Sequence, residues 1–291
     1  MYRDKKISVV VLAYNVEDHI AAVLEAMPDF VDIVYVVDDA SADRTADIVR
    51  NFALLHSQVD VLAVRQSGQP GTQNTECRTP RVEFIHHQVN RGPGAALSTG
   101  YGRAYADGMD IVVKVDGDNQ MPLEEMANLI DPLVSGRADY AKGNRLFDAA
   151  CRREMPRFRL VGNVMLTWLT RIASGNWRVN DPQNGYTAIS SHALSAVGQD
   201  LYPGYGYLND LLVRLNVHRL VVTDVPMAAR YGSEKSAIRL HRYVPKVSGL
   251  LLRLFVGRVS RCCRFRARDI RVGPYCRTDR GGTAEGTGPW A

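Results

Sequence analysis

The sequence has few cysteines for its 291 residues, and their positions exclude zinc-binding and disulfide-rich classes. The five are Cys77, Cys151, Cys262, Cys263 and Cys276, an odd number without the paired spacing of a zinc site. We therefore expect no disulfide framework and interpret the chain as a reduced, cytoplasmic protein. The seven histidines also lack metal-ligand spacing and are interpreted as structural.

Long apolar runs are missing as well. No stretch reaches the roughly 18 uncharged apolar residues that a membrane-spanning helix needs. The nearest candidate, residues 247–259, is interrupted by Arg253 and Arg258. Residues 1–6 are mostly polar and lead directly into a short apolar run, so we expect no secretory signal. The sequence contains no internal repeat.

The body of the chain also lacks an excess of charge of either sign. The formal net charge is +5, but nine arginines and only three acids lie between Arg253 and Ala291. A nucleic-acid-binding protein would carry its basic patch on the folded part, so nucleic acid is not expected as a partner. The 46% hydrophobic and 23% charged residues are instead typical of a soluble globular enzyme.

The first half of the chain alternates apolar runs with helical patterns. Strands are predicted over residues 7–12, 33–37, 59–64, 82–86 and 111–115. Helices are predicted over 17–27, 42–55 and from 93 to about 107, and residues 65–81 as an exposed loop. This order predicts an α/β protein with a mainly parallel central sheet and helices on both faces.

Past Pro122 the pattern changes. We predict a helix over 123–135, a short strand near 139–142 and an amphipathic helix over 158–173. Turns and mixed strands are expected from there to Tyr231. The apolar stripe of residues 238–258 is flanked by cations and predicts a further amphipathic helix. Residues 259–291 are basic, lack apolar periodicity and are expected to be disordered.

Two carboxylates, Asp116 and Asp118, follow the strand predicted over 111–115. Such a pair can hold a divalent cation, and the cation can hold a diphosphate. The alternative is an ordinary Asp-Gly turn. The strand over 33–37 likewise ends in acids, Asp38 and Asp39. Acid-bearing loops after several parallel strands are typical of the ligand-binding edge of a nucleotide-binding α/β protein.

The loops after the first two strands predict a nucleotide pocket. Asp38 and Asp39 are placed to accept hydrogen bonds from a base or a ribose, with an Asx turn that caps the next helix as the alternative. Ala13, Tyr14 and Glu17 are predicted to complete this pocket.

The glycine-rich loop at residues 90–96 precedes a helix. Backbone N–H groups at a helix N-terminus favour an anion, so Arg91 is a candidate contact for a diphosphate. An ordinary loop and a surface arginine remain the alternatives.

Seven motifs in order resemble those of the inverting glycosyltransferases of family 2, in the branch of polyprenyl- and dolichyl-phosphate sugar synthases. They are Val11-Leu-Ala-Tyr-Asn15, Asp38-Asp-Ala-Ser-Ala-Asp-Arg-Thr45, Asn90-Arg-Gly-Pro-Gly-Ala-Ala96, Asp116-Gly-Asp-Asn-Gln120, Gly143-Asn-Arg145, Asp181-Pro-Gln-Asn-Gly-Tyr186 and Arg230-Tyr-Gly-Ser-Glu-Lys-Ser236. The resemblance covers about residues 6–256 and implies a GT-A nucleotide-sugar-binding fold. It makes residues 1–237 the catalytic domain, residues 238–258 a membrane-proximal helix and residues 259–291 a tail.

The resemblance also implies roles for the acids after the fifth predicted strand. Asp118 is expected to bind Mg²⁺ or Mn²⁺, and Asp116 to hold the ribose or sugar end of the donor. Gln120 is expected to lie near the same site. A cation there would neutralise the charge that develops on the departing nucleoside diphosphate.

Further residues are candidates for the acceptor. Arg145 is expected to face a donor or acceptor phosphate, and Asp181 to act as a base or to position the acceptor. Asp210 is a weaker partner acid. Arg230 and Lys235 are expected to grip the phosphate of a lipid. A turn cap at Asp181 and a solvated basic turn at Arg230 and Lys235 are the alternatives.

These observations predict an inverting, metal-dependent hexosyltransferase that uses a UDP- or GDP-linked sugar and a polyprenyl phosphate acceptor at the cytoplasmic membrane face. A phosphate is already ionised and needs positioning more than deprotonation. With a sugar hydroxyl as acceptor, Asp181 would have to act as general base.

Two other classes remain open, a non-catalytic nucleotide-sugar-binding module and a phosphatase whose first Asp is the nucleophile. Close relatives usually continue into hydrophobic spans, whereas this chain ends in a basic tail. The cation-flanked apolar stripe of residues 238–258 and the basic tail predict peripheral membrane contact. The alternative is that the stripe packs on the catalytic domain and the tail is unfolded.

Overall fold

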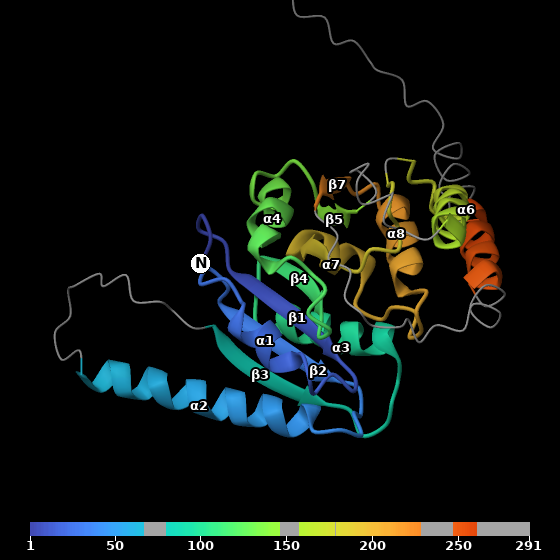
Figure 1. Ribbon diagram of the computed structural model, residues 1–291. Helices are drawn as coiled ribbons and strands as arrows, with labels where there is room; N and C mark the ends of the chain where they lie inside the picture. The colour runs from blue at the N-terminus through green and yellow to red at the C-terminus, as the bar shows by residue number, and fades with distance from the viewer. Residues whose placement is uncertain (67–79, 146–156, 178, 228–246, 261–291) are drawn as a thin grey trace, which may run out of the picture.

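A seven-stranded sheet organises the protein (Figure 1). The computed structural model describes residues 1–66, 80–145, 157–177, 179–227 and 247–260, without the side chains of 56–66 and 157–163. The strands are β1 (Ile7–Ala13), β2 (Ile33–Asp38), β3 (Arg81–His86), β4 (Ile111–Asp116), β5 (Tyr140–Asn144), β6 (Thr187–Ser190) and β7 (Val222–Pro226). Their order is β3-β2-β1-β4-β6-β5-β7, and only β6 runs antiparallel to its neighbours. The sheet is thus mainly parallel, as predicted.

Helices cover both faces of the sheet. On one face lie α1 (Ile20–Glu25), α2 (Thr45–Gln66), the short 3₁₀ helix η1 (Leu123–Glu125) and α4 (Met126–Val134). On the other lie α3 (Pro93–Ala106), α7 (Ser191–Val197) and α8 (Tyr207–Val217). At one end, α6 (Arg157–Ser174) packs beside a helix over residues 247–260. This two-sided arrangement is the α/β fold that the sequence predicts.

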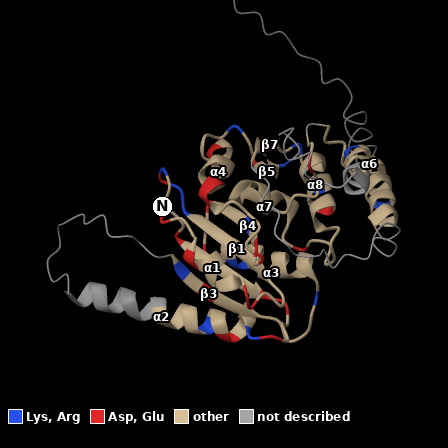
Figure 2. Ribbon diagram, in the orientation of Figure 1, with Lys and Arg blue, Asp and Glu red and all other residues tan. Residues whose placement is uncertain are grey.

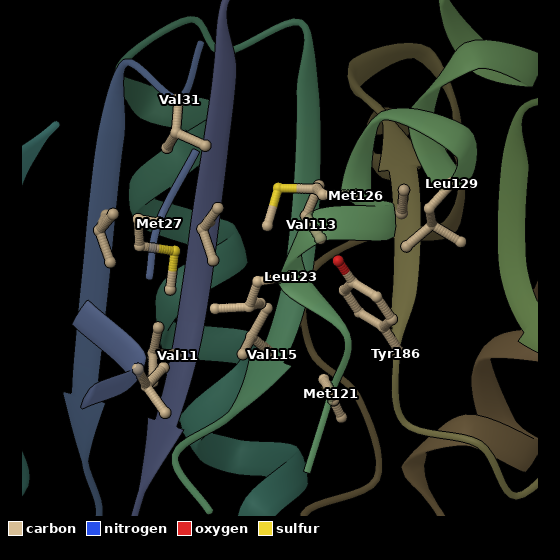
Figure 3. Close-up of a cluster of buried hydrophobic side chains, with 14 of the residues drawn as sticks. Val11, Met27, Val31, Val113, Val115, Met121, Leu123, Met126, Leu129 and Tyr186 are labelled. Carbon is tan, nitrogen blue, oxygen red and sulfur yellow. The ribbon is translucent and has the colours of Figure 1, made fainter. Parts of the chain in front are cut away.

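Alternate residues of each strand enter two separate cores. In β1, Val9 and Val11 face α1 and α4, while Val10 faces α3. Figure 3 shows the first core, where side chains of η1 and α4 meet those of β1 and β4. Complete burial of a Val or Leu side chain stabilises a fold by about 1.5–3 kcal/mol, so strands buried on both sides supply much of the driving force. The rigid sheet in turn fixes the loops at its edge.

Two predictions of secondary structure are wrong. Residues 59–64 are not a strand, because α2 continues to Gln66. No Gly or Pro lies between Thr45 and Gln66, so nothing in the backbone stops the helix, and its β-branched residues lower helix propensity only slightly. Helices α7 and α8 also lie where turns and mixed strands were expected.

The structure describes only part of the C-terminal segment. A helix occupies residues 247–260, whereas 238–246 and 261–291 lie outside the described residues. Among the helices described, none combines the length and the hydrophobicity that crossing a bilayer requires.

Candidate active site

Hydrogen bonds join the loops after β1 and β2 at the carboxyl edge of the sheet. The backbone N–H of Asn15 donates to Ser41 Oγ over 2.9 Å, and the N–H of Ala42 donates to Asn15 Oδ1 over 2.8 Å. Asn15 and Ala40 both have positive φ angles, which turn the chain sharply at each strand end. The two loops therefore form one connected wall of the site.

The predicted nucleotide contacts in the first loop have different environments. Ala13 is buried, and its carbonyl accepts from the N–H of Asp39 over 2.9 Å. Glu17 accepts from both the N–H and the Nε of Arg44 and so caps the start of α2. Tyr14 is 51% exposed and is the side chain of this group that a base or ribose can reach.

The carboxylate of Asp38 points into the protein. It accepts from the N–H and the hydroxyl of Ser41, and its other oxygen lies 2.8 Å from Nδ1 of His86. The side chain is fully buried and holds its own loop, but it does not cap the next helix, because Ser41 lies four residues before α2 begins at Thr45.

Asp39 holds the loop that leads into α3. It accepts from the N–H of Arg91 over 2.9 Å and of Gly92 over 2.7 Å. Its Oδ1 also lies 2.7 Å from Nδ1 of His87, which is buried and contacts Thr99 through Nε2. Asp39 thus connects β2 with the loop that carries Arg91.

The loop at residues 90–96 differs from the anion cradle predicted from its glycines. Besides the two N–H groups held by Asp39, those of Gly94 and Ala95 both donate to the carbonyl of Pro203. A Cβ on Gly94 would lie 1.9 Å from the carbonyl oxygen of Tyr202, so this glycine permits close packing instead. The exposed Arg91 side chain, which lines a surface hollow of about 410 Å³, is the remaining candidate contact for an anion here.

Asp116 is paired with Lys114, a residue of the strand predicted over 111–115 that was not among the candidate site residues. Lys114 is fully buried, and its Nζ donates to Asp116 Oδ1 over 2.5 Å. A Cβ on Gly185 would lie 2.5 Å from this Nζ and 2.9 Å from Asp116 Oδ2. Glycine at 185 therefore makes room for the ion pair, and the loop from Asp181 to Tyr186 lies against the Asp116 motif.

Asp118 lies in the turn after β4, beside the first loop. Gly117 donates its N–H to Leu12 O over 2.9 Å, and Asp118 Oδ1 accepts from the N–H of Gln120 over 3.1 Å. Hard oxygen ligands at this position fit Mg²⁺ or Mn²⁺.

The described residues supply few protein ligands for such an ion. Among them, no three His, Cys, Asp or Glu side chains gather closely enough to hold an ion. Diphosphate oxygens and water are ligands that could join Asp118 around an ion.

Arg145 and Asp181 form a half-buried ion pair on the other side of the site. Arg145 Nε donates to Asp181 Oδ2 over 2.8 Å, and Nη2 donates to Oδ1 over 3.3 Å. The Asp181 side chain is 3% exposed and that of Arg145 is 32% exposed. A guanidinium fork thus holds both carboxylate oxygens, while part of its surface remains open to a ligand.

A second buried lysine supports the same loop. Lys142 donates to the carbonyl of Asn184, whose side-chain amide donates to Gly143 O over 2.8 Å. Lys114 and Lys142 pair with the same residue of β6, Thr187, so the two lysines lie in one row across the sheet. Burial lowers the pKa of Lys142 to about 7. That Lys114 and Lys142 share a row of the sheet can be recognised only once the pairing of the strands is known.

Asp210 is not brought into this cluster. It lies in the first turn of α8, pairs with Arg214 over 2.7 Å and accepts from the N–H of Tyr202 over 3.0 Å, so it ties the segment before α8 to the helix. Arg230 and Lys235 lie outside the described residues.

Comparison with known proteins gives consistent matches. The family model described as Glycosyl transferase family 2 matches residues 8–198. A UDP-N-acetylglucosamine–dolichyl-phosphate N-acetylglucosaminyltransferase of Methanococcus voltae is 29% identical over 78% of this chain and 87% of its own length. An undecaprenyl-phosphate mannosyltransferase of Micrococcus luteus is 24% identical over 58% of this chain and 70% of its own.

Solved structures share the fold. Glucosyl-3-phosphoglycerate synthase from Mycobacterium tuberculosis, in complex with Mn²⁺, UDP and glucosyl-3-phosphoglycerate, superposes with a TM-score of 0.58. The match has 22% sequence identity and covers 88% of this chain and 80% of the other. The arrangement of strands and helices described above is therefore a known one.

Proposed function

Because the chain belongs to glycosyl transferase family 2, we propose that it moves a sugar, with inversion, from a UDP- or GDP-linked donor to a polyprenyl phosphate at the cytoplasmic face of a membrane. The lipid-phosphate acceptor is supported by the relatives from M. voltae and M. luteus, whose names specify dolichyl and undecaprenyl phosphate. The two names specify different sugars, N-acetylglucosamine and mannose.

The ion pair between Asp181 and Arg145 is the observation that favours a phosphate over a sugar hydroxyl as acceptor. A sugar hydroxyl must lose a proton as it attacks, and a carboxylate that took up this proton would give up its charge and with it its ion pair. Both oxygens of Asp181 are already held by Arg145. A phosphate oxygen is ionised before it attacks and needs only to be positioned, which suits an arginine that is one-third exposed.

On the donor side, Asp118 would hold Mg²⁺ or Mn²⁺ together with the donor diphosphate. When bound, such an ion neutralises the charge of the leaving nucleoside diphosphate. Asp116, fixed by Lys114, is assigned to the ribose or sugar end of the donor, and Tyr14 to the nucleoside. Gln120 lies in the same turn. Asp38 and Asp39 would act on the pocket by shaping its loops.

The test is a transfer assay on the purified chain. Labelled UDP- and GDP-sugars are each incubated with a polyprenyl phosphate, detergent and Mn²⁺ or Mg²⁺, and the lipid product is extracted. We expect label in a lipid that releases its sugar on mild acid treatment, with one nucleotide preferred. Donor binding without turnover would indicate a binding module, and release of inorganic phosphate would indicate a phosphatase. Either result would reject the proposal.

A further inference from the structure

Helix α6 turns large apolar side chains toward solvent. The exposed ones are Val164, Met165, Trp168, Leu169 and Ile172, with exposed fractions between 42% and 62%. The side that faces the protein carries Leu166 and Ala173 together with the buried Thr167 and Thr170. A surface helix normally has the opposite polarity, and a cluster of exposed apolar side chains usually marks a binding surface.

The helix over residues 247–260 extends this apolar surface. Val247 and Leu251 pack against Ala173 of α6, and Arg258 Nη2 donates to Ile172 O over 2.9 Å. The two helices therefore form one unit at the end of the molecule away from α2 (Figure 1). The second helix also exposes apolar side chains, namely Leu252, Val256 and Val259.

Aromatic and cationic groups accompany these side chains. The rings of Trp168 and Trp177 meet edge to face at 6.1 Å, and both are more than half exposed. The guanidinium of Arg171 lies 5.8 Å from the Trp168 ring, and Arg253 is exposed. The sequences of α6 and of residues 247–260 contain no Asp or Glu, as the absence of red on these helices in Figure 2 illustrates. Tryptophans and arginines without acids are the groups that anionic membrane interfaces attract.

The apolar surface adjoins the acceptor side of the site. Arg171 Nε donates to Val179 O over 2.8 Å, and Thr167 Oγ1 donates to Asn180 O over 3.4 Å. The next residue is Asp181, which pairs with Arg145. A surface that touched the outer side of α6 would thus lie beside the loop assigned to the acceptor.

We infer that the outer side of α6, Trp177 and the helix over 247–260 form one docking face for the surface of an anionic lipid bilayer. This docking face differs from the membrane contact predicted from residues 238–258, because Val247, Leu251 and Leu254 of that stripe are buried and the opposite side of the helix is exposed. The docking face would bring the phosphate of a membrane lipid close to Arg145, a role that rests on the proposed function. A second copy of the chain is a poorer occupant, since a symmetric contact would bring the arginines of two copies together without acids to pair with them.

The experiment is flotation of the full chain with vesicles of phosphatidylcholine alone or mixed equally with phosphatidylglycerol. We expect binding to the anionic vesicles that falls at high salt. Trp168→Ser combined with Trp177→Ser should lower the bound fraction about tenfold. The matched control replaces Leu54 and Leu55, which are exposed to a similar degree on the distant α2, and should bind like the wild type.

A second double variant shows whether weaker vesicle binding by the first could result from misfolding. Leu252→Ser with Val256→Ser changes the other helix and should weaken vesicle binding in the same direction. Unchanged binding of both double variants, or equal loss in the α2 control, would overturn the docking face. A dimer in lipid-free buffer that the tryptophan variant dissociates would assign the face to a second copy and overturn it as well.

Docking and transfer can fail separately. Vesicle binding that depends on the tryptophans, without transfer to any polyprenyl phosphate, would support the docking face and reject the proposed function. Transfer in detergent by a chain that does not bind vesicles would reject the docking face and leave the function standing.

Discussion

Lys114 is the residue that most changes the interpretation of the acidic motif. Its buried ammonium binds one oxygen of Asp116, so the two acids of the motif are not equivalent. Asp116 is fixed by the protein, which leaves Asp118 as the better candidate for a cation. Because the Asp116 side chain is 37% exposed, removal of its partner would not leave a fully buried charge.

Lys114→Met is therefore expected to preserve the fold and to weaken donor use. We predict a loss of about tenfold in kcat/KM, equivalent to about 1.4 kcal/mol, because Asp116 is no longer held in place. Calorimetric titration with the nucleotide and Mn²⁺ should show weaker binding. Lys114→Arg keeps the charge and should restore part of the loss. Normal donor binding and turnover in the Met variant would show that the pair is only structural.

Lys142 predicts a pH dependence of stability. Burial lowers its pKa to about 7, Asp181 and Asp224 oppose that shift, and Arg145 and Lys114 add to it. An unfolded lysine keeps its proton up to about pH 10.5, so above pH 7 the unfolded chain binds more protons. The free energy of unfolding should therefore rise with pH between about 7 and 10.5, by up to about 1.4 kcal/mol per unit.

Urea unfolding of the wild type and of Lys142→Met at several pH values in this window measures the effect. The wild type should gain stability relative to the variant as the pH rises. Parallel curves for the two proteins would mean that the lysine keeps its proton in the folded state.

The positions of some site residues could be predicted from the sequence, whereas the partners of others could not. Asp116 and Asp118 were found from their place after an apolar run, and the structure puts them at the edge of the sheet as expected. The inward direction of Asp39 could not be found, because its partners His87, Arg91 and Gly92 lie 48 to 53 residues away. Lys114 was hidden for a related reason: a lysine within an apolar run becomes informative only when its face of the sheet is known.

At the scale of elements, the start of α3 packs with its backbone directly against the segment before α8. Gly94 lies so close to this segment that a Cβ would come within 1.9 Å of Tyr202 O and 2.8 Å of Tyr207 Cβ. Gly94→Ala is expected to lower the free energy of unfolding by about 2 kcal/mol or more, since backbone must move. Guanidinium unfolding of the purified variant measures this.

Gly102 provides the control in the same helix. A Cβ there would meet only the flexible end of Gln199, at 3.3 Å, so Gly102→Ala should be neutral or stabilise by up to about 1 kcal/mol. Equal stability of the two variants would contradict the close packing at the start of α3.

The elements that were predicted correctly are those whose pattern is local. Strands such as 33–38 and 111–116 are continuous apolar runs with polar ends, and α3 begins at a Pro after a Gly. The extension of α2 was missed because a β-branched run over 59–64 has the composition of a strand. Helix α7 was missed because it has seven residues and follows β6 directly, too short for a clear periodicity.

At the scale of the whole molecule, the antiparallel strand β6 brings the two halves of the site together. Its first residue, Thr187, pairs with Lys114, so the preceding loop from Asp181 to Tyr186 runs past Asp116. The residues proposed to bind the donor, at the ends of β1, β2 and β4, and those proposed to bind the acceptor, after β5 and before β6, therefore share one edge of the sheet. This order of strands could not be deduced from the sequence without the family resemblance.

If the residues at this edge of the sheet form one active site, loss of the Asp118 charge should lower the rate of sugar transfer and leave the free energy of unfolding unchanged. Asp118→Asn keeps an oxygen to accept from the N–H of Gln120 but removes the charge that would hold a cation. We predict a loss of about a hundredfold in rate, roughly 3 kcal/mol, with an unchanged free energy of unfolding. Near-normal turnover of the variant in Mg²⁺ or Mn²⁺ would remove Asp118 from the metal site.

The most direct test of the central claim compares two acceptors that differ only in the phosphate. The chain is given its preferred nucleotide sugar with either a polyprenyl phosphate or the corresponding polyprenol, in the same detergent, and kcat/KM is measured for each. With Asp181 held by Arg145, we predict transfer to the phosphate at least a thousandfold faster than to the alcohol, a difference of about 4 kcal/mol. Comparable transfer to the polyprenol would mean that the site deprotonates a hydroxyl, and would contradict the account.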